Sequence, residues 1–130
     1  MPLSQDDHTK YKALYLQTAR DYIKELQDNT SVLIATPENI SALEAVYRAA
    51  HSLATQSAMM EYNQIGAVSS VMEKLFKQTK DSRTPLTKEV LQSLLDTIQT
   101  MSEDLEVIDK DNKENDLSQD ATKLQTLVLT

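Results

Sequence analysis

The sequence has no cysteine and no tryptophan, and it has only one glycine and three prolines. Without cysteine the chain has no disulfide, thiolate metal site or cysteine nucleophile, which fits a reducing cytoplasm. All-β folds need many turns built from glycine and proline, so the scarcity of both residues argues against such folds. A glycine-rich phosphate-binding loop is also absent, and the chain is therefore not expected to bind ATP itself.

Positive charge and long apolar runs are scarce as well. The chain has 13 Lys and Arg against 20 Asp and Glu, a formal net charge of −7. This balance argues against nucleic-acid binding, because a protein that follows phosphates needs the opposite sign. No apolar run approaches the roughly 20 residues that cross a bilayer. The first ten residues lack the basic region and apolar core of a signal peptide. A soluble cytoplasmic domain without a membrane span is expected.

The abundant residues favour helices. Leu, Ala, Gln, Lys, Glu and Met are plentiful, and 130 residues suffice for one domain with its own core. Apolar residues recur at steps of three and four, which predicts helices over about 7–28, 37–60, 63–78, 86–109 and 117–129. The charged stretch at about 110–116 predicts a linker. Four long amphipathic helices with short connections predict an all-α, antiparallel up-down four-helix bundle with a short fifth helix, in a single domain over residues 1–130.

Local signals place the ends of these helices. Residues 29–37 are expected to form the first connection, with Thr36 as N-cap and Pro37 at the first position of the second helix. Thr84 and Pro85 similarly mark the start of the fourth helix. The apolar periodicity is expected to bury Tyr11 and Leu14 in the first helix and Ile40 and Ala58 in the second.

His51 is the main candidate for chemistry, whereas His8 lies near the start of the chain and is expected to be exposed and without a task. If the break near residues 61–63 is a tight turn between antiparallel helices, residues equidistant from it face one another. Position 62 is the midpoint of 51 and 73, so His51 should face Glu73. A carboxylate beside an imidazole holds one ring nitrogen protonated and leaves the other as a nucleophile or acceptor.

Other chemistries fit the sequence less well. The ordinary role of a histidine on a helix is to pack and hydrogen-bond without chemistry. A metal site needs two or more further ligands at helical spacing, and His51 has only Glu44 nearby on its own helix, so no metal site is expected. A hydrolase needs a nucleophile and an oxyanion hole, for which this glycine-poor chain offers no sharp turn. The remaining hypothesis is a histidine that carries a phosphoryl group for the active site of another domain.

The residues around His51 resemble a known family. Residues 47–53, YRAAHSL, resemble the phosphorylated-histidine helix of histidine phosphotransfer (HPt) domains, and most closely the N-terminal phosphotransfer domain of CheA-type chemotaxis histidine kinases. The similarity continues through residues 58–60 (AMM), Tyr62 and residues 72–75 (MEKL), so it spans the second and third helices.

The resemblance implies a five-helix phosphotransfer module with no stand-alone catalysis. His51 would accept the γ-phosphoryl group of ATP, held with Mg²⁺ in a separate histidine kinase domain, and pass it to an aspartate of a response-regulator receiver. Glu73 would orient the imidazole, and Arg48, one turn before His51, is a candidate to neutralise the phosphate. This domain would bind no cofactor. The expected partner surface contains Ala54, Thr55, Met59 and Tyr62.

The sequence departs from the family pattern at three positions. Family members usually have Lys-Gly three and four residues after the histidine, where this chain has Ala54 and Thr55. A glycine usual near the end of that helix is replaced by Glu61. These differences keep open a slow or unusual phosphotransfer, and a degenerate docking module that is not phosphorylated. In a third alternative, an unrelated helical adaptor, the imidazole and the carboxylate would lie more than one water apart.

Overall fold

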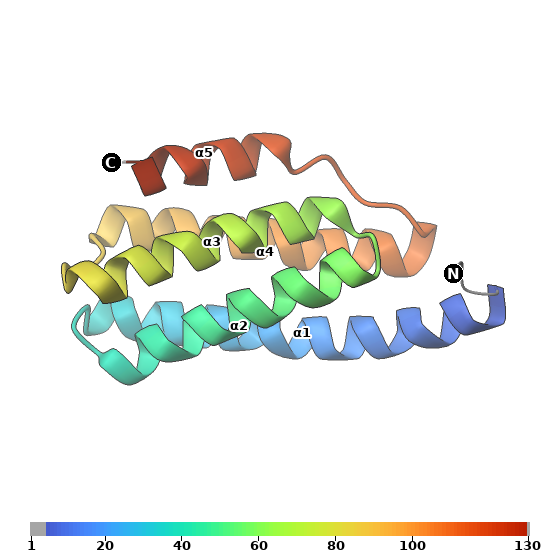
Figure 1. Cartoon of the computed structure of the whole chain (residues 1–130), viewed down its shortest axis with the longest axis horizontal. Coiled ribbons are helices and arrows are strands. Elements are labelled where there is room, and N and C mark those ends of the chain that lie inside the picture. Colours follow the sequence, from blue (N-terminus) through green and yellow to red (C-terminus); the bar gives the residue numbers. More distant parts are fainter. Residues whose placement is uncertain (1–4, 130) are drawn as a thin grey trace.

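The computed structural model describes residues 5–129, which form five α-helices joined by short turns and contain no strand (Figure 1). The helices are α1 (Gln5–Ala35), α2 (Ile40–Met59), α3 (Asn63–Ser82), α4 (Lys88–Asp111) and α5 (Ser118–Leu129). The first four alternate in direction, and α5 returns along α3 (Figure 1). Because α1 packs against α2 and α4, α2 packs against α3, and α5 packs mainly on α3, the predicted all-α bundle with a fifth helix is confirmed.

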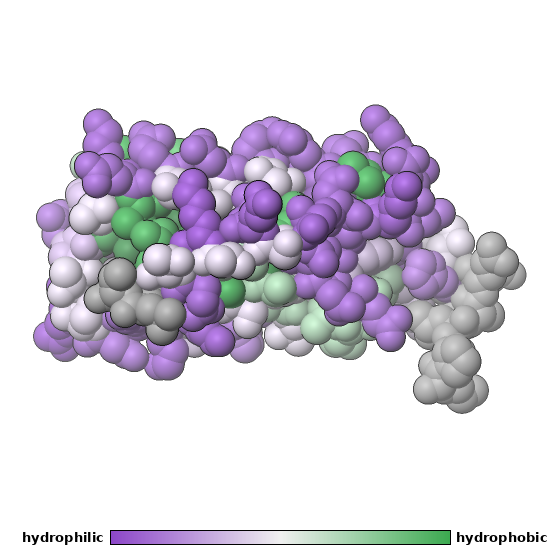
Figure 2. Space-filling view, turned by 90° about the horizontal axis from the view of Figure 1, so that it is seen from above, coloured by the Kyte–Doolittle hydropathy of each residue, from purple (hydrophilic) through white to green (hydrophobic). Residues whose placement is uncertain are grey.

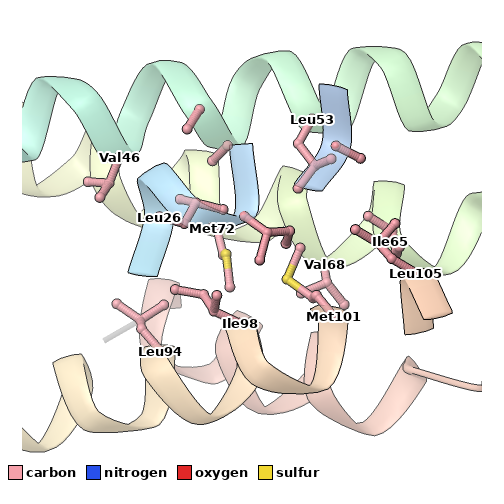
Figure 3. Close-up of a cluster of buried hydrophobic side chains, with 14 of the residues drawn as sticks. Leu26, Val46, Leu53, Ile65, Val68, Met72, Leu94, Ile98, Met101 and Leu105 are labelled. Atoms are coloured by element: carbon pink, nitrogen blue, oxygen red, sulfur yellow. The ribbon is translucent and has the colours of Figure 1, made fainter. Parts of the chain in front are cut away.

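One apolar core joins all five helices. In Figure 3 the side chains of Leu26, Leu53 and Met72 converge with Ile98 and Met101 between the helices. The largest side chains that are almost completely buried are Leu26, Leu33, Leu53, Ile65, Met72, Phe76, Leu91, Leu94, Ile98, Met101, Leu105 and Ile108. Burial of this set holds α2 and α3 side by side, because each contributes a continuous stripe to the same core.

The helix α5 covers the surface between α3 and α4 only in part. Its contribution to the core comes from Leu117, just before the helix, and from Leu124. Seen from the α5 side, the surface is largely hydrophilic, but a hydrophobic area remains near the C-terminal end of α5 (Figure 2). There a hollow of about 360 Å³ lies between Leu127 and the start of α4, with Leu86 and Val90 among its lining residues.

The prediction that residues 29–37 form a connection is wrong, because α1 continues to Ala35. Leu33 lies seven residues after Leu26 and is buried on the same face, and Thr30 is buried as well. The amide of Asn29 donates to the carbonyl of Glu25 within the helix, at 2.9 Å. The apolar stripe thus runs through the polar-looking residues 29–31 and extends the helix.

Two helix starts also differ from the prediction. Helix α2 begins at Ile40 because Oδ1 of Asn39, not the hydroxyl of Thr36, accepts a hydrogen bond from the N–H of Ala42 (2.9 Å). Helix α4 begins at Lys88, since Oγ1 of Thr87 accepts from the N–H of Val90 (3.2 Å). Asn39 and Thr87 each lie three residues before the amide that they accept from, which is the spacing that an N-cap needs. Helix α3 likewise ends later than predicted, at Ser82.

Four apolar residues expected in the core are exposed instead: Tyr11, Leu14, Ile40 and Ala58. The first turns of α1 extend beyond the α2–α3 turn (Figure 1), and Tyr11 and Leu14 in these turns are 46% and 53% exposed. Ile40 is the first residue of α2 and is 75% exposed. Periodicity identifies a face of a helix, but it does not show where neighbouring helices stop.

The α2–α3 turn is short and packs against α1. Glu61 adopts a left-handed conformation (φ 64°), and the N–H of Tyr62 donates to the carbonyl of Ser57 at 2.8 Å. The ring of Tyr62 is buried 4.9 Å from the ring of Tyr15, whose hydroxyl makes a hydrogen bond of 2.7 Å with Oγ of Ser57. These contacts fix the turn against α1, and burial raises the pKa of Tyr15 far above its usual value.

Replacing Glu61 with glycine is expected to stabilise the protein by about 0.5–1 kcal/mol. A residue other than glycine costs about 1–2 kcal/mol in the left-handed region. Glycine removes this cost, but part of the gain is lost because glycine has a larger conformational entropy in the unfolded chain. Urea unfolding followed by circular dichroism measures the change. The matched control, Ala58→Gly in the last turns of α2, should instead cost up to about 1 kcal/mol. A destabilised Glu61→Gly variant would contradict the turn conformation.

Candidate functional site

His51 of α2 and Glu73 of α3 lie opposite each other, as the midpoint at position 62 predicts. The imidazole Nδ1 is 2.8 Å from Oε2 of Glu73. The His51 side chain is 60% exposed, whereas that of Glu73 is 25% exposed. The acid is therefore held against the bundle while most of the ring remains open to solvent. This distance removes the main support for an unrelated adaptor, which required the two groups to lie apart.

A second pair shows that the facing positions come from the backbone register. Glu44 and Lys80 are also equidistant from position 62, and they form an ion pair of 2.9 Å between Oε1 and Nζ. The same Nζ lies 4.4 Å from the centre of the Tyr47 ring. Two polar pairs with one midpoint indicate that the packing of α2 on α3, and not one side-chain rotamer, brings His51 to Glu73.

The pair can hold the imidazole in one tautomer. A carboxylate oxygen accepts, so Nδ1 carries the hydrogen in this contact and the lone pair of Nε2 is left for another group. The hydroxyl of Thr55 donates to the carbonyl oxygen of His51 at 3.1 Å, within the helix. In this tautomer Nε2 is the ring nitrogen that can accept a bond from another group.

The other expected site residues take different places. Arg48 is exposed one turn before His51, and no ion pair involves it among the residues that the structure describes. Thr55 is exposed and Met59 is 78% exposed, while Ala54 is half-buried. The prediction that Tyr62 belongs to an exposed partner surface is wrong. Its side chain is 7% exposed because the turn folds its ring onto Tyr15.

The surface around His51 is open. A hollow of about 520 Å³ lies at the other end of the α2–α3 hairpin, between the α1–α2 and α3–α4 turns, and neither His51 nor Glu73 lines it. Within residues 5–129 no group of three or more His, Cys, Asp or Glu side chains is placed to hold a metal ion. None of the helices described is long and apolar enough to cross a membrane. The exposed imidazole is accessible to another macromolecule.

Sequence reasoning missed two acids near the α2–α3 turn. The Tyr62 side chain does not cap α3, and the carboxylate of Glu114 accepts from the N–H groups of Gln64 (3.0 Å) and Ile65 (2.9 Å) instead. Asp104 is completely buried in α4. The sequence contains an indication of each acid. Position 62 lacks a residue suited to cap α3, which indicates that a cap must come from elsewhere, and Asp104 falls on the apolar face of α4.

Comparison with known proteins gives consistent matches. The family model described as "Hpt domain" matches residues 10–106, a stretch that contains both His51 and Glu73. The chemotaxis protein CheA of Borreliella burgdorferi is 23% identical over 117 residues, which are 89% of this chain and 14% of that protein. The CheA protein of Listeria monocytogenes is 26% identical over 98 residues (75% of this chain and 15% of that protein). The CheA protein of Bacillus subtilis is 22% identical over 121 residues (91% and 18%).

The chain thus spans less than a fifth of the length of these curated relatives. A crystal structure of the phosphorylated P1 domain of CheA3 in complex with CheY6, from R. sphaeroides, superposes with a TM-score of 0.83. The match covers 92% of this chain and 96% of that chain at 16% identity, so it shows the same fold. With the family model matched over most of its length, the chain belongs to the Hpt domain family.

Proposed function

We propose that the chain is a histidine phosphotransfer module of a chemotaxis-like two-component pathway in the cytoplasm. His51 accepts a phosphoryl group from ATP bound with Mg²⁺ in a histidine kinase domain and passes it to an aspartate of a response-regulator receiver. The observation that carries the proposal is the exposed imidazole held by Glu73 at 2.8 Å. The Hpt family match supports it, as does the similar structure, a phosphorylated P1 domain of CheA3 in complex with CheY6.

The two transfer steps need only the imidazole and its acid from this chain. The Nε2 lone pair attacks the γ-phosphorus, the Nε2–P bond forms, and the bond to the ADP oxygen breaks. Glu73 stabilises the proton on Nδ1 as the ring becomes positive. In the second step the receiver carboxylate attacks phosphorus, the Nε2–P bond breaks, and the imidazole returns to its neutral form. Metal and nucleotide belong to the kinase partner, and the Hpt domain contributes positioning.

Arg48 is the proposed cation beside the phosphorylated ring. Side chains on a helix lean towards its N-terminus, so the His51 ring leans towards the turn that carries Arg48. A guanidinium at this exposed position offers a modest attraction to phosphate, since water screens it. Thr55 and Met59 supply the exposed part of the proposed partner surface, and Ala54 lies at its half-buried edge.

Incubation with a histidine kinase catalytic domain and labelled ATP tests the proposal. The expected label is labile in acid and stable in alkali, as phosphohistidine is, and it moves to a receiver domain added afterwards. An absence of label with every competent kinase would contradict phosphotransfer. Ala54 and Thr55, in place of the lysine and glycine usual in the family, favour the second candidate, a docking module. That candidate predicts binding of the receiver with no label at any time.

Glu73→Ala is expected to slow phosphorylation by about 10–100-fold, by analogy with the loss caused by removing the partner that orients a metal-ligating histidine. The free energy of unfolding should change by only about 0.5 kcal/mol, because Glu73 lies on the flank of the core. Rapid-quench labelling measures the rate. The matched control is Glu44→Ala, which breaks the neighbouring pair with Lys80 and leaves the imidazole untouched. Equal rates in Glu73→Ala and wild type would remove Glu73 from the mechanism.

A further inference from the structure

The segment between α4 and α5, residues 112–117, is fastened to the rest of the bundle at both ends. At its start, Nζ of Lys12 donates to the carbonyl of Asp109 (3.1 Å) and to the side-chain oxygen of Asn112. At its end, the N–H of Leu117 donates to Oε1 of Gln64 at 2.7 Å. The segment expected to be a linker is therefore a strap that ties the start of α5 to α1 and to the first turn of α3.

The middle of the strap holds Glu114 at the N-terminus of α3. Each oxygen of its carboxylate accepts one backbone hydrogen bond, from the N–H groups of Gln64 and Ile65. Free N–H groups and the positive end of the helix dipole favour a negative charge at this place. Glu114 therefore caps a helix from a position 50 residues away in the sequence.

Asp104 lies close to Glu114 and has no exposed surface. One of its oxygens accepts the backbone N–H of Asn115, whereas Oδ2 is buried and has no hydrogen-bond partner. Burial raises the pKa of Asp104 to about 7; the Asn115 N–H opposes this shift, and the Glu114 carboxylate adds to it. A buried acceptor without a donor is costly for a carboxylate, but a protonated Oδ2 can donate to Glu114.

We propose that Asp104 and Glu114 share one proton and form a pH-sensitive latch that holds the strap, and with it α5, on the first turn of α3. The proton lies on Oδ2 of Asp104 and is donated to the Glu114 carboxylate. When it is lost, two negative charges face each other in a buried place, and the strap opens. The latch is independent of phosphotransfer by His51.

The groups around the pair supply no replacement for this proton. Tyr15 of α1 and Tyr62 of the α2–α3 turn lie near Glu114, and burial raises the pKa of each tyrosine, so both are neutral near pH 7. Within the part of the chain that the structure describes, no lysine, arginine or histidine forms an ion pair with Asp104. The N-terminus of α3 is a positive element that faces Glu114, and the Glu114 carboxylate already occupies it.

The direction of the pH effect follows from the raised pKa of Asp104. The pKa of Asp104 is about 7 in the closed state and near its ordinary value of about 4 when the strap is open. Between these values the closed state binds one proton more than the open state, so closure weakens as pH rises. The latch contributes fully to the equilibrium constant for closure below about pH 4. Between about pH 4 and 7 this constant falls by at most about tenfold per pH unit, and above about pH 7 the contribution is lost.

Hydrogen exchange on the intact domain tests the latch. Opening constants are measured for the amides of Asn115, Leu117 and Ile65 from pH 5 to 8, after correction for the intrinsic exchange rate. In wild type they should rise by several-fold to about tenfold per unit up to pH 7 and then level off. Asp104→Asn keeps an acceptor for Asn115 and a donor for Glu114, so its opening constants should be low and independent of pH. The control Glu103→Gln, an exposed neighbour, should follow wild type.

Two results would overturn the latch: opening constants in wild type that do not change between pH 5 and 8, or an Asp104→Asn profile that follows wild type. If Asp104→Asn does not fold, the carboxyl carbon shift of Asp104 is followed by NMR in wild type. A midpoint above 6 supports the shared proton, and a midpoint near 4 overturns it. Phosphorylation enters none of these measurements, so the latch and the proposed function fail independently.

Discussion

His51→Gln is expected to abolish the phosphoryl label, and His8→Gln is expected to retain it in full. These are the two histidines of the chain, and both are exposed. Only His51 has an acid at 2.8 Å that fixes its tautomer. A glutamine has no nucleophilic nitrogen, so no Nε2–P bond can form and the loss should be complete rather than partial. Labelling with ATP and a histidine kinase domain, followed by alkaline gel electrophoresis, measures both variants.

The comparison also separates chemistry from folding. A glutamine at position 51 can still donate an amide hydrogen to Glu73, and the ring that it replaces is mostly exposed. The free energy of unfolding of His51→Gln should therefore stay within about 0.5 kcal/mol of wild type. A label that persists in His51→Gln would place the phosphoryl group elsewhere. A label lost from both variants would mean that both histidines are needed for phosphorylation.

The contact between His51 and Glu73 can be predicted from the sequence because it depends only on the length of the α2–α3 turn and on the regularity of the two helices. A turn of three residues, Met60 to Tyr62, leaves little freedom in the register of α2 against α3. Both helices are regular from the turn to the site, so positions equidistant from residue 62 remain opposite over eleven residues. The ion pair of Glu44 with Lys80, seven residues further along, follows the same rule. The pairing was predictable because every step between the turn and the site is local.

The features that could not be predicted depend on distant residues. Tyr62 is buried because Tyr15, 47 residues earlier, offers its ring as a packing surface. The cap of α3 comes from Glu114, and nothing in residues 60–66 indicates which distant acid reaches it. Helix α1 ends seven residues later than the sequence predicts, because Asn29 and Thr30 resemble a turn until the burial of Leu33 is known.

Leu94→Ala is expected to cost about 2–5 kcal/mol of the free energy of unfolding. Leu94 lies in α4 with no exposed surface, close to Ile98 in the centre of the core (Figure 3). The substitution removes buried methyl groups and leaves a cavity that the surrounding helices fill only in part. Leucine and alanine are both good helix formers, so helix propensity does not explain such a loss. Urea unfolding followed by circular dichroism measures it.

The matched control is Leu14→Ala in α1, where the same atoms are removed from a side chain that is 53% exposed. It should cost less than about 1 kcal/mol, because little buried area is lost. Similar losses in the two variants would contradict the core shown in Figure 3. Since α4 carries neither member of the His51–Glu73 pair, the folded fraction of Leu94→Ala should be labelled at the wild-type rate. A slower rate per folded molecule would show that packing of the core, and not only the α2–α3 turn, sets the distance between imidazole and carboxylate.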